Sequence, residues 1–181
     1  MTDTNTEWER RLADLWASIE NLDGDEFLAR IDRLAAELPA GSPVAAFERA
    51  SALDSTGHSD QAAPLYRQAL DDGLRGLRRR RAVIQMASSL RNVGRAEESV
   101  ELLTAERDAD SDELDDAVAA FLALALVDTG REREAVAIAL TALAPHLPRY
   151  QRSLANYAGE LELSLPTRTK ENRRDGKDDK P

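Results

Sequence analysis

The stretch ASALDSTGHSDQAAPLYRQAL, residues 50–70, contains the pattern that indicates how this chain folds. It places Ala50 seven residues before Gly57, with Ala62 and Ala69 five and twelve residues after that glycine. On both sides of Gly57, apolar residues recur every three or four positions, which is the period of an α-helix. The stretch therefore predicts two helices joined by a tight turn, with small side chains where the helices cross.

The same spacing recurs around Gly24, Gly94 and Gly130, so that the four glycines are 33, 37 and 36 residues apart. The residues seven before the glycines are Ala17, Ala50, Ala87 and Ala123, and those five after are Ala29, Ala62, Ser99 and Ala135. The residues twelve after are Ala36, Ala69, Glu106 and Ala142. Self-similarity at this period predicts an array of stacked helical hairpins.

The apolar periodicity also sets the expected boundaries. Hairpins are expected over residues 6–38, 43–72, 74–107 and 112–144, followed by a capping helix over residues 149–165. Residues 167–181 lack periodicity and carry dense mixed charge, so we expect a disordered tail. The chain should thus form one all-α repeat domain, residues 1–166, shaped as a right-handed α-solenoid of about four hairpins with a cap.

Composition excludes several classes of protein. The 181-residue chain has a formal net charge of −10, which disfavours nucleic-acid binding, and no cysteine, which excludes disulfides and thiolate metal sites. No apolar run approaches the ~20 residues that span a membrane, and the polar N-terminus lacks the order of a signal peptide. We expect a cytoplasmic protein. The body uses arginine rather than lysine, which favours a GC-rich bacterial source.

No cluster of residues predicts catalysis, a metal or a cofactor. Asp108, Asp110 and Asp112 have the spacing of calcium ligands. However, Glu113 and Ala119 stand where a calcium loop needs glycine and a bidentate glutamate. The two histidines form no convincing nucleophile or metal site, and no glycine-rich phosphate loop occurs. The chain is expected to be non-enzymatic.

The order of small residues, turn glycine and later aromatic resembles the tetratricopeptide repeat, whose period is about 34 residues. The resemblance extends over about residues 10–165 and is weakest in the first unit, where Arg33 takes the aromatic place and Glu20 the leucine place. It is strongest in the second unit, through Ala50, Gly57, Ala62, Tyr66, Ala69 and Leu70.

The resemblance implies that the first helices of successive hairpins line a concave groove, which binds a peptide or helix of a partner protein. On this sequence the groove would present Leu15, Ser18, Phe47, Ser51, Arg81, Ile84, Gln85, Ser88, Asn92, Phe121 and Leu124. An exposed strip through Phe47, Ile84 and Phe121 would be a docking surface. The alternative is that these side chains pack inside the array.

Five arginines lie between the second and third hairpins: Arg75, Arg78, Arg79, Arg80 and Arg81. Their guanidinium forks would suit an anion or an acidic peptide. The alternative, which the acidic surroundings favour, is a solvated helix start paired with Asp71, Asp72 and the acidic body of the chain.

The sequence therefore predicts a non-enzymatic interaction scaffold with an unidentified protein partner, and with neither nucleic acid nor membrane as a partner. The alternative function is a self-associating structural protein, in which the groove or the last hairpin forms a homodimer interface.

Overall fold

The computed structural model describes residues 2–163, with side chains from residue 6 onward except at residue 162. This part of the chain is helical and has no strand, which confirms the predicted all-α fold. The helices are α1 (Thr2–Ala17), η1 (Ile19–Asn21), α2 (Gly24–Ala35), α3 (Pro43–Ser55), α4 (Ser59–Asp71), α5 (Gly76–Asn92), α6 (Ala96–Arg107), α7 (Asp115–Asp128), α8 (Glu132–Leu143), η2 (Ala144–His146) and α9 (Gln151–Leu163). The predicted disordered tail, residues 167–181, lies outside the described residues.

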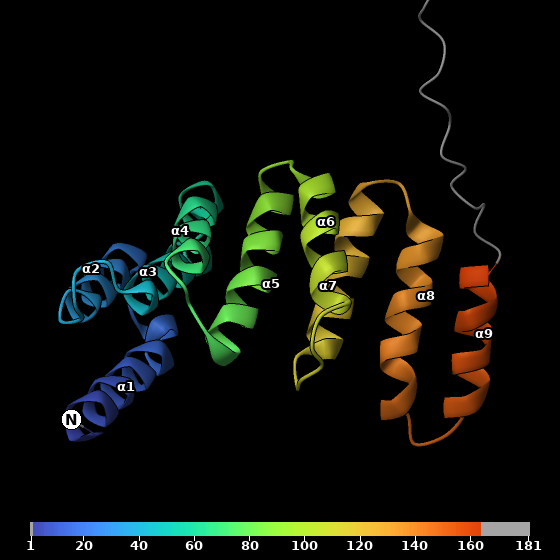
Figure 1. Cartoon of the computed structure of the whole chain (residues 1–181), viewed down its shortest axis with the longest axis horizontal. Helices are drawn as coiled ribbons and strands as arrows, with labels where there is room; N and C mark the ends of the chain where they lie inside the picture. Colours follow the sequence, from blue (N-terminus) through green and yellow to red (C-terminus); the bar gives the residue numbers. More distant parts are fainter. Residues whose placement is uncertain (1, 164–181) are drawn as a thin grey trace, which may run out of the picture.

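From α3 to α9 the helices follow one another in a row along the long axis of the molecule (Figure 1). From α3 onward, each helix packs against the next one in the sequence, up to α9 on α8. The pairs α3–α4, α5–α6 and α7–α8 are therefore stacked hairpins, as an α-solenoid requires.

Three of the four repeated glycines make the same turn. Gly57, Gly94 and Gly130 have φ of 87°, 81° and 72°, a conformation that glycine adopts without strain. The next residue donates its N–H at 2.8 Å to the carbonyl of the leucine four positions before the glycine. These bonds are His58 to Leu53, Arg95 to Leu90 and Arg131 to Leu126. Each first helix thus ends in the same hydrogen-bonded C-terminal motif.

The repeated alanines lie at the helix crossings of these hairpins. Ala50, Ala62 and Ala69 are fully buried around Tyr66, in a cluster that continues onto α5 through Met86. The next cluster contains Ala87, Ala123 and Ala135 and joins α5, α6, α7 and α8. Small side chains at these positions allow the helices to approach closely.

The first hairpin departs from this arrangement, although its spacing matches. Ala17, Ala29 and Ala36 are exposed. Gly24 is the first residue of α2 and does not have a positive φ. The expectation that all four glycines make one kind of turn is therefore wrong for Gly24. Large side chains build this core instead, including Trp8 and Phe27.

The helix α9 takes the place that the first helix of a fifth hairpin would have. Ala158 is buried and Leu154 half-buried in the packing of α9 onto α8. No described helix covers its other side. On α9 Tyr157 and Leu163 are exposed, as is Tyr150 just before the helix.

Candidate protein-binding surface

The first helices of successive hairpins approach one another on one side of the array. α3 contacts α5 and α5 contacts α7, whereas no comparable contact joins α4 with α6 or α6 with α8 among the described residues. Because the first helices lie closer together than the second helices, the array curves toward the first helices. This side is the inner face.

Side-chain contacts between the first helices identify the inner positions. Asp54 of α3 accepts a hydrogen bond of 2.8 Å from Ser89 of α5, and Ser51 donates one of 3.5 Å to Gln85. On the next pair, Arg91 of α5 donates to Asp128 of α7. In the second unit these contacts are made by the residues six and three positions before Gly57, and in the third unit Arg91 also lies three positions before Gly94.

These two positions change character along the array. Six residues before the repeated glycines stand Ser18, Ser51, Ser88 and Leu124. Three residues before them stand Asn21, Asp54, Arg91 and Val127. The inner face is thus polar in the second and third units and becomes apolar in the fourth.

In the polar part of the inner face, the side chains form hydrogen bonds with one another. Asp54 also accepts a bond of 3.0 Å from Ser59, and Asn92 donates to the Ser59 hydroxyl at 3.2 Å. The Tyr66 hydroxyl donates to Ser51 at 3.4 Å. These side chains hold α3, α4 and α5 together.

A buried carboxylate joins the first three inner helices. Glu48 of α3 is buried and accepts from the Trp16 indole at 3.1 Å and from Arg78 Nε at 3.0 Å. The other two nitrogens of Arg78 donate to both carboxylate oxygens of Glu9, at 2.9 and 2.6 Å. The bonds to Glu9 raise the pKa of Arg78 above its ordinary value. These charge-assisted bonds offset the cost of burying Glu48.

The expected groove residues divide by burial. Phe47, Ser51 and Ile84 are buried, so the expectation of an exposed strip through Phe47 and Ile84 is wrong. The Phe47 ring lies 6.1 Å from that of Tyr66, inside the second hairpin. The half-buried ones are Leu15, Ser18, Gln85, Ser88 and Phe121, and the exposed ones are Arg81, Asn92 and Leu124. The alternative expectation, that these side chains pack inside the array, therefore holds for Phe47, Ser51 and Ile84.

Exposed apolar residues occur on α7, at the other end of the inner face, and on α9. Leu124 is 46% exposed and Val127 is 47% exposed, one helical turn apart on α7. On α9, Gly159 corresponds to Ala123, so Tyr157 corresponds to Phe121 and Leu163 to Val127. Both residues of α9 are exposed. Extending the glycine register to these positions would have identified Val127, Tyr157 and Leu163 from the sequence.

The arginine cluster is a solvated helix start only in part, because Arg75, Arg79 and Arg81 are exposed whereas Arg80 is not. Arg80 is buried, and its Nη2 donates to Asp115 at 2.7 Å. Arg79 and Arg80 both lie beside Glu106, which is buried where two other units have a buried or half-buried alanine. No ion pair with Asp71 or Asp72 occurs among the described residues. Arg79 and Arg80 pair instead with carboxylates of α6, of the following loop and of the start of α7, which are Glu106, Asp112 and Asp115.

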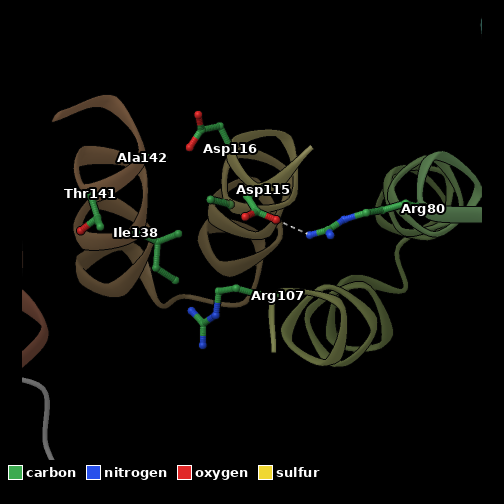
Figure 2. Close-up of a pocket in the computed structure, with 8 residues that line it drawn as sticks. Arg80, Arg107, Asp115, Asp116, Ile138, Thr141 and Ala142 are labelled. Carbon is green, nitrogen blue, oxygen red and sulfur yellow. Dashed lines mark hydrogen bonds and ion pairs between the residues drawn. The ribbon is translucent and has the colours of Figure 1, made fainter. Parts of the chain in front are cut away.

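A cavity of about 410 Å³ lies beside this ion-pair cluster, between the helices α5 to α8 (Figure 2). Figure 2 shows Arg80 reaching across to Asp115 at its edge. A hydrogen bond from Ser111 is the main cause that lowers the pKa of Asp115 below its ordinary value. Asp116 lies 2.8 Å from His146. The carboxylates that line the cavity are therefore already used in contacts within the chain.

No helix in residues 2–163 is long and apolar enough to cross a membrane. In comparisons with known proteins, the family model described as Tetratrico peptide repeat matches residues 43–161, which is more than half of the chain. No curated protein and no solved structure matches the chain. The matched range begins at the first residue of α3 and leaves out the first hairpin, which is also where the packing departs from the repeat.

Proposed function

Because the chain belongs to the tetratricopeptide repeat family, whose repeats suggest protein–protein interaction, we propose that it binds a peptide or helix of a partner protein on its inner face. The family generally consists of non-catalytic scaffolds, and we infer that this chain also acts without catalysis. The docking site in this proposal is the apolar inner strip, defined as Phe121, Leu124 and Val127 of α7 with Tyr157 and Leu163 of α9.

One observation carries the proposal: the inner face changes from polar to apolar at α7. Where the preceding unit has Ser88 and Arg91, this unit presents Leu124 and Val127, each nearly half exposed. Covering the exposed part of each would stabilise a complex by about 1 kcal/mol per residue. An amphipathic helix or an extended apolar segment supplies a cover of this kind.

The experiment compares two matched pairs of substitutions. Leu124→Ser with Val127→Ser removes the centre of the apolar inner strip. Val136→Ser with Leu143→Ser makes the same chemical change on α8, where both residues are 47% exposed and lie outside the strip. A partner is first identified by cross-linking in native extract, and its Kd is then measured with purified proteins.

We expect the inner pair to raise the Kd about thirtyfold, because about 2 kcal/mol of contact is lost. The α8 pair should leave the Kd unchanged. Equal affinity of the inner pair and the parent, or equal loss in both pairs, would contradict the proposal.

Self-association is the second candidate, favoured by one observation. Of the nine large hydrophobic residues exposed in the described part of the chain, seven lie at or beyond Leu124, including Val136 and Leu143 on the last hairpin. The variant with Val136→Ser and Leu143→Ser on α8 would dissociate a homodimer that forms through that hairpin. Sedimentation velocity separates the two candidates, because partner binding by the inner strip predicts a monomer when the partner is absent.

A further inference from the structure

A second pocket lies where α3 and α5 begin, away from the apolar inner strip. It has a volume of about 520 Å³. The residues that matter for its chemistry are Arg75, Arg78, Arg81, Pro43, Val44 and Leu77. Three guanidinium groups therefore border a small apolar surface.

The three arginines differ in whether they are neutralised. Arg78 is held by the two carboxylates of Glu9 and Glu48. Arg75 and Arg81 have no ion pair among the described residues. The guanidinium carbon of Arg81 lies 5.4 Å from the centre of the Phe47 ring, a contact that positions the side chain and leaves its N–H groups available. Arg75 precedes α5 and makes no side-chain capping bond.

The position of these charges is unfavourable without an anion. The N-terminus of a helix carries a partial positive charge, and the first turn of α5 contains no acidic residue to balance it. Arg79 and Arg80 are offset by Glu106 and the following loop, and Arg78 by its two glutamates. The charges of Arg75 and Arg81 remain, so a carboxylate bound there would be stabilised.

The apolar part of the pocket indicates more than a simple anion. Leu77 is exposed and lies between the two free arginines in the sequence, with Val44 half-buried beside it. At 1.5 Å of rise per residue, Arg75, just before α5, and Arg81 start about 9 Å apart, so two separate carboxylates can each pair with one of the arginines. An extended chain rises about 3.3 Å per residue and turns every second side chain to the same face. Acidic residues at positions i and i+4 with an aliphatic residue at i+2 therefore face the pocket together and span about 13 Å, which the long arginine side chains can reach.

We propose that this pocket binds an extended acidic segment of a partner protein, in which an aliphatic residue lies on Leu77 and flanking acidic side chains pair with Arg75 and Arg81. The inference rests on the proposed function, since it assumes a protein partner. It uses residues that the apolar inner strip does not include.

The test uses the short synthetic peptide Glu-Ser-Leu-Ser-Glu with both ends blocked, in which the glutamates and the leucine share one face of an extended chain, and the same peptide with glutamine in place of glutamate. Binding is followed by fluorescence anisotropy. The protein variants are Arg75→Gln with Arg81→Gln, and a control with the same change in net charge, Arg149→Gln with Arg152→Gln. The control arginines are exposed near the start of α9 and have no ion pair within residues 2–163.

We expect the parent to bind the glutamate peptide and the glutamine peptide to bind at least about tenfold more weakly. The Arg75/Arg81 variant should lose at least about tenfold in affinity, and the Arg149/Arg152 control should keep the parental value. No binding by the parent, or equal loss in both variants, would overturn the inference. Because neither Arg75 nor Arg81 makes an ion pair in the fold, thermal unfolding of the variant should match the parent and shows that the loss is local.

The Leu124/Val127 variant separates this inference from the proposed function. It should bind the glutamate peptide like the parent. If the peptide fails to bind while the native partner still depends on Leu124 and Val127, the pocket is refuted and the proposed function stands. If the peptide binds through Arg75 and Arg81 while the Kd of the native partner is unchanged in the Leu124/Val127 variant, the apolar inner strip is refuted instead.

Discussion

The first and second hairpins carry the same spacing of small residues and use it differently. Ala50 is fully buried and Gly57 closes its turn with a φ of 87°. The equivalent Ala17 is exposed, and the equivalent Gly24 is part of a helix. The matched family range begins only at residue 43. A repeat spacing therefore predicts stacked packing only where the other core residues fit it.

The physical reason lies in the size of the neighbouring side chains. The second hairpin has alanines at its crossings, so its helices can lie close together. In the first hairpin, Trp8 packs between α1 and α2 and donates to the Leu34 carbonyl at 2.9 Å. Trp16 contacts Phe27 edge-on at 5.1 Å. Aromatic side chains of this size separate the helices, and the small residues are left on the surface.

The largest expected effect concerns the position twelve residues after the glycine. Glu106→Ala would restore the residue of the other units, yet it should reduce the free energy of unfolding by about 3 kcal/mol, because buried Arg80 loses a carboxylate partner. Urea denaturation measures this change. In the first hairpin, Ala36→Glu at the equivalent exposed position should change stability by less than about 0.5 kcal/mol.

Combining Glu106→Ala with Arg80→Met tests the reason for that loss. The double variant replaces the buried charges with apolar groups and should recover most of the stability. A Glu106→Ala protein as stable as the parent would contradict the role assigned to this ion pair.

A smaller effect is expected at the helix crossing. Ala123→Leu should destabilise the fold by about 2 kcal/mol, because Ala123 is buried between packed helices and extra volume forces them apart. The matched change Ala17→Leu adds the same volume at an exposed site and should have little effect. Thermal unfolding of both variants tests the difference, and equal melting temperatures would show that Ala123 does not lie at a close crossing.

The smallest expected effect is in the turns. Gly94→Ala should cost about 1 kcal/mol, because an alanine side chain is strained at a φ of 81°. Gly24→Ala should be neutral or slightly stabilising, since Gly24 is helical and an added methyl group meets only Thr56 at an ordinary 3.7 Å. Chemical denaturation of the two variants measures the difference. A similar loss in both would mean that the two glycines have the same role.

Much of the fold could be predicted because its signals are local. The leucine, glycine and alanine spacing around Gly57, Gly94 and Gly130 predicts both the turn and the helices on each side of it. The candidate surface was less predictable. Leu124 and Phe47 are both apolar residues of a first helix, and only the surrounding packing leaves one exposed and buries the other. Phe47 faces Tyr66 of its own hairpin, whereas no described side chain covers the exposed part of Leu124.

Helix periodicity and turn glycines act over a few residues, so the amino-acid order alone was enough to predict an array of α-helical hairpins. Which spacings are used for close packing, and which arginines are neutralised, follows from how the helices stack on one another. Arg80 forms ion pairs with Glu106 and Asp115, and Arg78 with Glu9, and in each pair the two residues lie on different helices. Such pairings depend on how the helices stack, since burial and ion pairing are set by neighbours that lie far away along the chain.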